Sequence, residues 1–218
     1  MANSGDYCFE FLGQHLHLLP QKAIFWREAN TLLLADLHLG KVSHFRKAGI
    51  ALPGTAALRD YEVLSALLDR HVGARVVLLG DLFHSVANAE WALFADWMRQ
   101  YPTTAFVLVK GNHDILPAPL YHAERMTVFP ETWHVPPFVF SHIALPEPPT
   151  NGYNLSGHVH PAVRLSGRGS QQLVLPCFYF RPGGGLLPAF GSLTGRATIQ
   201  AVPGSQVFVV TPNAVLPV

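Results

Sequence analysis

The chain has 218 residues, of which 49% are hydrophobic and 13% are charged. This length and composition fit a globular protein with a large core and exclude an intrinsically disordered chain. The formal net charge is +1, so a polyanionic partner is neither required nor excluded. There are 12 histidines against 14 acidic residues. Because histidine is the commonest metal ligand, this excess favours a metal site.

No apolar run approaches the roughly 18 residues of a membrane-spanning helix, and the first residues lack the basic and apolar regions of a secretory signal. We therefore expect a cytoplasmic protein with no membrane association. The two cysteines, Cys8 and Cys177, are too few for a disulfide framework and share no metal-binding spacing. We expect both to be thiols in the core.

Short strand-like segments occupy the chain from Cys8 to Trp26, and Gly13-Gln14 is the expected turn of a hairpin. The apolar run that ends at Ala35 predicts a buried strand. Apolar residues at helical spacing then predict a helix over residues 58–72, which Gly73 would end.

Two further buried strands are predicted at residues 76–79 and 106–109, with a helix over residues 88–100 between them. Strand and helix thus alternate, which is the pattern that builds a parallel sheet. Beyond Pro117 the helical patterns stop. Strand-like runs separated by proline and glycine follow, as in an antiparallel or mixed sheet. No repeat or linker is visible, so we expect a single domain over residues 1–218.

Polar side chains follow the buried strands. Asp36 and His38 come after the first strand, and their spacing of two places both side chains on the same side of an extended chain. Asp81 follows the second strand and Asn112 follows the third. The carboxyl ends of parallel strands meet at one edge of a sheet, so we expect these side chains to lie close together.

Three histidines, His142, His158 and His160, follow two of the later strand-like runs. Each polar cluster alone has an ordinary explanation as a turn, a surface histidine or one face of a strand. Together they supply the nitrogen and oxygen ligands that two first-row cations about 3.5 to 4 Å apart require. The ordered set therefore favours a site for two metals.

The same ordered series resembles the motifs of the calcineurin-like metallophosphoesterases over roughly residues 31–161. The motifs are Asp36-x-His38, Gly80-Asp81, Gly111-Asn112-His113-Asp114, His142 and Gly157-His158-x-His160. The resemblance implies an α/β fold, a four-layer α/β/β/α sandwich with two mixed sheets. It also implies phosphoester hydrolysis with two divalent metal ions. These ligand types accept Mn²⁺, Fe²⁺ or Zn²⁺, and we expect manganese.

The resemblance divides the metal ligands into two sets that share a bridging carboxylate, Asp81. The first set is Asp36, His38, Asp81 and His160, and the second is Asp81, Asn112, His142 and His158. It also implies that His113 is a proton donor or leaving-group stabiliser and not a ligand, with Asp114 placed to orient it.

Motifs at both ends of the chain resemble the bacterial ligase-associated DNA damage response endonucleases, a group linked to a DNA ligase and a helicase-like protein. They are Asp36-Leu37-His38-Leu39-Gly40-Lys41, Phe45-Arg46-Lys47-Ala48-Gly49-Ile50, Leu175-Pro176-Cys177-Phe178, Leu187-Pro188-Ala189-Phe190-Gly191 and Thr194-Gly195. This resemblance implies phosphodiester hydrolysis in single-stranded or damaged DNA. The motifs after residue 175 contain no obvious catalytic group, and we expect them to form strands and turns beside the site.

Four further residues are candidates for contact with the substrate. His44, Arg46 and Lys47 could contact the DNA backbone, on charge alone, and His84 could line the substrate groove. Each could equally be an ordinary exposed residue. The Leu82-Phe83 that follows Asp81 departs from the Asp-Arg pair of the related protein Ser/Thr phosphatases, and His113 replaces the arginine of the lipid-A pathway pyrophosphatases. Both classes are therefore disfavoured.

Two other functions stay open. The same metals could serve a small-molecule phosphodiesterase or a nucleotide pyrophosphatase, although no long insertion would roof over a compact pocket. Alternatively the chain could be a non-catalytic scaffold with the same fold, which predicts that metal ligands are missing.

Overall fold

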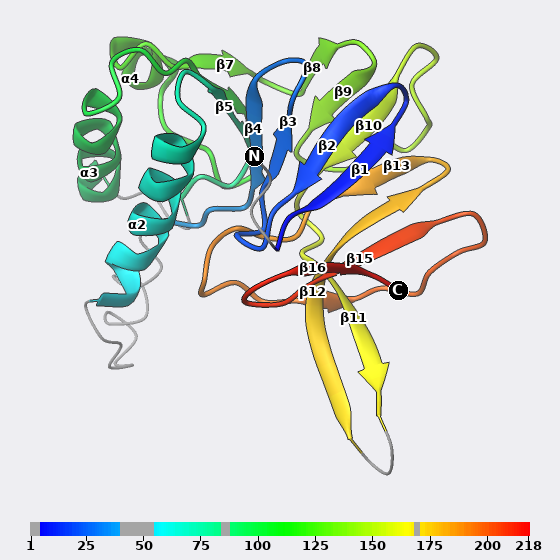
Figure 1. Cartoon of the computed structure of the whole chain (residues 1–218). Coiled ribbons are helices and arrows are strands. Elements are labelled where there is room, and N and C mark those ends of the chain that lie inside the picture. The colour runs from blue at the N-terminus through cyan, green and yellow to red at the C-terminus, as the bar shows by residue number, and fades with distance from the viewer. Residues whose placement is uncertain (1–4, 40–54, 84–87, 168–170) are drawn as a thin grey trace.

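The computed structural model describes residues 5–39, 55–83, 88–167 and 171–218. Two mixed β-sheets pack against each other, and the helices of these ranges cover the outer face of the first sheet (Figure 1). The expected α/β sandwich with two mixed sheets is confirmed. None of the described helices is both long and apolar enough to cross a membrane.

The first sheet has seven strands in chain order. They are β1 (Tyr7–Phe11), β2 (Gln14–Leu18), β3 (Ile24–Trp26), β4 (Thr31–Ala35), β5 (Arg75–Leu79), β6 (Phe106–Val109) and β7 (Thr127–Phe129). Strands β1 to β4 pair antiparallel, and β4 to β7 pair parallel. The predicted parallel core is therefore confirmed.

The second sheet has nine strands, in the order β14-β11-β12-β13-β10-β9-β8, with β15 paired to β12 and β16 to β15. They are β8 (Thr132–Val135), β9 (Phe138–Ser141), β10 (Tyr153–Ser156), β11 (Pro161–Ser166), β12 (Gln172–Arg181), β13 (Gly184–Leu186), β14 (Ala197–Thr198), β15 (Gln206–Val210) and β16 (Val215–Pro217). Figure 1 shows β11 and β12 extending beyond the body of the sandwich as a long hairpin.

Alternation along β4 divides the core into two layers. Leu32 and Leu34 pack toward the helices α2 (Thr55–Arg70) and α3 (Asn88–Arg99). Leu33 and Ala35 face the second sheet. Since both faces of the strand are covered, all five of its residues are buried. The strand ends directly before Asp36.

Several expectations need correction. A short helix, α4 (Ala118–Ala123), follows Pro117, where we expected helices to stop. Pro117 is its N-cap, and Pro119 lies in the first turn, where the fixed φ of proline suits a helix. The hairpin turns at Leu12-Gly13, where φ is 53° and 70°, and not at Gly13-Gln14. Helix α2 begins and ends earlier than predicted.

The expectation for the cysteines was half wrong. Cys177 is buried in β12, but Cys8 is exposed. Cys8 lies on β1, an edge strand on which the neighbouring Phe9 points into the core. Alternation along the strand turns the thiol outward.

Candidate metal centre

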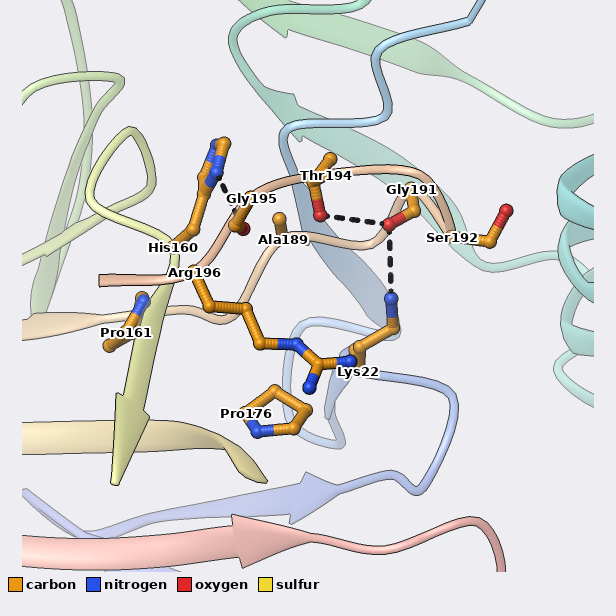
Figure 2. Close-up of a pocket in the computed structure, with 10 residues that line it drawn as sticks. All are labelled: Lys22, His160, Pro161, Pro176, Ala189, Gly191, Ser192, Thr194, Gly195 and Arg196. Carbon is orange, nitrogen blue, oxygen red and sulfur yellow. Dashed lines mark hydrogen bonds between the residues drawn. The ribbon is translucent and has the colours of Figure 1, made fainter. Parts of the chain in front are cut away.

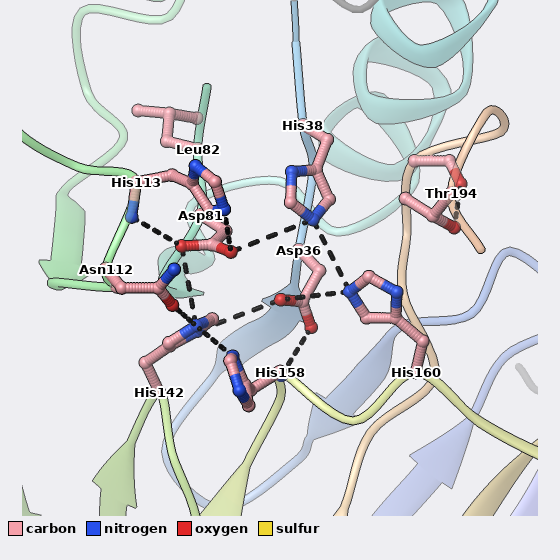
Figure 3. Close-up of polar contacts among 12 residues, drawn as sticks. Asp36, His38, Asp81, Leu82, Asn112, His113, His142, His158, His160 and Thr194 are labelled. Carbon is pink, nitrogen blue, oxygen red and sulfur yellow. Dashed lines mark hydrogen bonds and ion pairs between the residues drawn. The ribbon is translucent and has the colours of Figure 1, made fainter. Parts of the chain in front are cut away.

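The predicted ligands come from the carboxyl ends of β4, β5 and β6 in the first sheet and from loops of the second sheet (Figure 3). Pairing of β4 with β5 continues beyond both strands. The amide of Asp36 donates to the carbonyl of Gly80, at 3.2 Å, and the amide of His38 donates to the carbonyl of Asp81, at 2.9 Å. This pairing holds the first two ligand segments side by side.

Five of the seven predicted ligands have a left-handed backbone. Their φ values are 54° at Asp36, 49° at His38, 50° at Asp81, 66° at His158 and 53° at His160. Positive φ is uncommon for residues other than glycine and is concentrated at functional sites. The backbone is thus bent at the ligands themselves, and this bending turns side chains from different strands toward a common point.

Asp36, His38 and His160 form the first group whose ligand atoms lie close enough to share an ion. The Nε2 atom of His160 lies 3.4 Å from the Nε2 atom of His38 and 3.4 Å from Oδ1 of Asp36. Asp36 Oδ1 is buried and has no hydrogen-bond partner among the described residues. A buried carboxylate oxygen without a partner is costly, and a cation between these three atoms would satisfy it.

Asp81, His142 and His158 form the second group. Nε2 of His142 lies 3.4 Å from Oδ1 of Asp81, 3.0 Å from Nδ1 of His158 and 3.1 Å from the side-chain oxygen of Asn112. Carboxylate, imidazole and amide oxygen are ligands that first-row divalent cations accept. The structure therefore brings all seven predicted metal ligands together in two adjacent groups.

Asp81 lies between the two groups. Its Oδ2 atom is 3.8 Å from Nε2 of His38, in the first group, while its Oδ1 atom is 3.4 Å from Nε2 of His142, in the second. A carboxylate that presents one oxygen to each group has the placement that a bridging ligand requires.

Backbone carbonyl groups orient two of the histidines. Nδ1 of His142 lies 3.0 Å from the carbonyl oxygen of Leu79, and Nδ1 of His160 lies 3.2 Å from that of Gly195. A carbonyl can only accept, so each contact favours a proton on Nδ1. It leaves the lone pair of Nε2 for a metal, as is usual for metal-binding histidines.

Backbone amides and glycines fix the two carboxylates. The amide of His158 donates to Oδ2 of Asp36, at 2.9 Å, and the amide of His113 donates to Oδ1 of Asp81, at 3.0 Å. A Cβ atom at Gly157 would collide with the Asp36 carboxylate, and one at Gly111 would collide with that of Asp81. Glycine is therefore needed at both positions for close approach.

His113 lies at the solvent side of the centre. Its side chain is 41% exposed, and its Nε2 atom is 4.0 Å from Oδ2 of Asp81. Asp114 is buried, and its carboxylate accepts hydrogen bonds from the amides of Gly111 and Leu82, at 2.8 and 2.9 Å. Burial raises the pKa of the Asp114 carboxyl to about 6. These bonds tie together the loops after β5 and β6, so Asp114 fixes the loop that carries His113.

The segment after β13 supports the first ligand loop. The amide of Phe190 donates to the carbonyl of Ala35, at 2.8 Å, and the amide of Gly191 donates to that of Asp36, at 3.1 Å. The Lys22 ammonium in turn donates to the carbonyls of Phe190 and Gly191, at 2.5 and 3.3 Å. The sequence placed this segment beside the site, but nothing in it indicated the contribution of Lys22.

The four substrate-contact candidates, His44, Arg46, Lys47 and His84, lie outside the described residues. The structure thus describes the predicted ligands, His113 and Asp114, and not these four positions.

Comparison with known proteins fits this geometry. The sequence model of the calcineurin-like phosphoesterases matches residues 29–173, which carry all seven predicted ligands. The chain belongs to this family. As a calcineurin-like phosphoesterase it is a metal-dependent enzyme, and its two ligand groups correspond to the two divalent metals that the family uses.

Among solved structures, this calcineurin-like phosphoesterase is similar to the nuclease MPE of Pseudomonas putida. The two chains are 32% identical, and they superpose with a TM-score of 0.81 over 98% of this chain and 100% of the other. No curated protein sequence matches.

Proposed function

We propose that this protein hydrolyses phosphodiester bonds in DNA, with single-stranded or damaged DNA as its substrate and two manganese ions as its cofactors. The observation that carries the proposal is the pair of ligand groups on either side of Asp81, with the exposed His113 beside them. The similarity to a protein described as a nuclease, along nearly the whole chain, supports a nucleic acid as the substrate.

Two divalent cations in these groups would stabilise negative charge on the phosphate oxygens and acidify a bound water near neutral pH. The residues of the chain hold the cations and supply the proton. Asp36 and Asp81 hold the cations from carboxylates that backbone amides fix. His113, whose side chain is 41% exposed, would donate a proton to the departing oxygen.

The proposal extends to the biological setting. The motifs shared with the ligase-associated endonucleases suggest a role in DNA repair, in the cytoplasm, with a DNA ligase and a helicase-like protein as partners. His44, Arg46, Lys47 and His84 remain candidates for contacts with DNA. These parts rest on sequence resemblance and charge.

One of the two alternatives fits the observations less well. A non-catalytic scaffold predicts missing ligands, whereas all seven lie together. A small-molecule phosphodiesterase would use the same ligand groups, so it must be separated by experiment.

The decisive experiment compares four substrates with the manganese-loaded protein: bis-p-nitrophenyl phosphate, p-nitrophenyl phosphate, single-stranded DNA and double-stranded DNA. We expect hydrolysis of the diester in preference to the monoester, and internal cleavage of DNA. Hydrolysis of the monoester alone would contradict the proposal, and hydrolysis of the small diester without cleavage of DNA would favour the small-molecule alternative.

A further inference from the structure

Two adjoining hollows, together called the groove, lie along the segment after β13 and beside the predicted ligand His160. The near end of the groove is a small pocket of about 20 Å³ that is lined by His160 and by Arg196 (Figure 2). Its far end is a hollow of about 510 Å³ between α2 and the β12 and β15 strands. The two parts share Lys22, Pro176, Ser192 and Arg196. These shared residues place the two parts next to each other, with His160 lining one part and Arg59 of α2 lining the other.

The described part of the groove has an excess of positive charge. Lys22, Arg59 and Arg196 line it together with one acidic residue, Asp60. Asp60 accepts hydrogen bonds from the amide and the hydroxyl of Ser192, at 3.2 and 3.3 Å. Lys22 and Asp60 influence each other electrostatically and offset each other in charge. Arg59 and Arg196 therefore account for the excess positive charge of the groove.

The guanidinium groups of Arg196 and Arg59 have N–H donors available for a ligand. Arg196 is exposed, and within the described residues one hydrogen bond is found for its guanidinium, from Nη1 to the carbonyl of Val174, at 3.2 Å. Arg59 is exposed on α2, and no described carboxylate pairs with either arginine. A guanidinium has five N–H donors in a geometry that matches phosphate. Lys22 differs, because its ammonium already donates to two backbone carbonyls.

We propose that this groove binds the phosphates of a polynucleotide strand that flank the scissile bond. Arg196 would contact the phosphate nearer the metal centre, and Arg59 one further away. The inference rests on the proposed function and deepens it, because it assigns residues outside the metal centre to the phosphates that flank the scissile bond. A small diester has no flanking phosphates, so it would occupy the metal centre without reaching the groove.

The test uses the full chain with manganese and two charge-removing substitutions, Arg59→Gln and Arg196→Gln, singly and together. We expect a several-fold higher Kd for single-stranded oligo(dT), measured by fluorescence anisotropy with calcium in place of manganese. Each phosphate contact on a single strand contributes a slope of about 0.7 to log K against log salt. The double variant should therefore flatten this slope by roughly 1.4. The loss of kcat/KM on oligo(dT) should be much larger than the loss on bis-p-nitrophenyl phosphate.

Arg27→Gln is the matched control, because it removes the same charge from an exposed residue before β4, at the opposite end of the strand from Asp36. It should bind oligo(dT) with the wild-type salt slope. The inference is overturned if the double variant keeps the wild-type affinity and salt slope, or if Arg27→Gln changes them equally. It is also overturned if kcat/KM falls equally on oligo(dT) and on bis-p-nitrophenyl phosphate. Failure of the proposed function is distinct, since wild-type protein would then fail to cleave DNA.

Discussion

The ammonium group of Lys22 donates a hydrogen bond to the carbonyl of Phe190, 2.5 Å away, although 168 positions separate the two residues in the sequence. The amide of Phe190 donates a hydrogen bond to the carbonyl of Ala35, and the amide of its neighbour Gly191 donates one to the carbonyl of Asp36. Lys22 therefore acts on a predicted metal ligand through two backbone contacts. Partners hydrogen-bonded directly to a ligand typically change metal affinity 10- to 100-fold, and Lys22 acts one step further out.

Lys22→Met should lower manganese affinity about 10-fold, because the segment that supports Asp36 loses its two hydrogen bonds. Titration of the metal-free protein with manganese, followed by calorimetry, measures this. Circular dichroism should show an intact fold. Wild-type manganese affinity in the variant would contradict a positioning role for Lys22.

The same lysine predicts a dependence of stability on pH. Burial lowers the pKa of the Lys22 ammonium to about 8, and Arg196 and Arg59 add to the shift while Asp60 opposes it. Between pH 8 and 10.5 the unfolded chain therefore binds more protons than the folded chain, so the free energy of unfolding rises with pH. Urea unfolding of wild type and Lys22→Met across this window should show a rise of about 1–3 kcal/mol in the wild type relative to the variant. If the free energies of unfolding of the wild type and the variant change with pH in parallel, the lowered pKa of Lys22 is refuted.

Asp81→Asn should reduce occupancy of both metal positions and lower turnover at least about 10²-fold, because one carboxylate presents an oxygen to each ligand group. Asparagine keeps the shape and an acceptor for the amide of His113, so the fold should persist. Metal content by mass spectrometry tests the assignment. Two metals per chain with near-normal activity would show that Asp81 does not bridge.

His113→Ala should lower the rate of DNA cleavage by about 10²- to 10⁴-fold, the usual contribution of proton transfer from a positioned side chain. On bis-p-nitrophenyl phosphate the loss should be clearly smaller, since p-nitrophenolate leaves without a proton. Metal content should stay at the wild-type level. Equal losses on both substrates, or loss of a metal, would instead make His113 a ligand or a structural residue.

Gly157→Ala should lower both metal binding and activity, because the new Cβ atom would collide with the carboxylate of Asp36. Gly195→Ala is the control. Nothing lies within 4 Å of a Cβ atom at that position, and the carbonyl that His160 contacts is kept. If both variants behave alike, the close approach at Gly157 does not shape the metal centre.

The parallel core was predictable because its signals are local. Each strand from β4 to β6 is a continuous apolar run, and each is followed by polar residues that then meet at one edge. The signals were weaker where burial is one-sided or the element is short. Helix α4 has six residues, and Cys8 occupies the outward face of an edge strand. Composition alone could not place either one.

The metal centre could be predicted only in part from local patterns. Strand ends explain why Asp36, Asp81 and Asn112 meet. His142 and His158 follow strands β9 and β10 of the other sheet. Their approach depends on how the two sheets pack, for which the family resemblance was needed. The carbonyl of Gly195 and the ammonium of Lys22 gave no signal, because a backbone group has no sequence signature and the lysine contact spans most of the chain.

The seven predicted ligands are divided between the sheets, with four from segments after β4 to β6 and three from segments after β9 and β10. Neither half of the chain therefore contains a complete set. During synthesis, the first sheet can form while His142, His158 and His160 are still to be translated. Tight binding of two cations must then wait until the second sheet has docked. A chain arrested before the second sheet docks would therefore lack a complete ligand set for either cation.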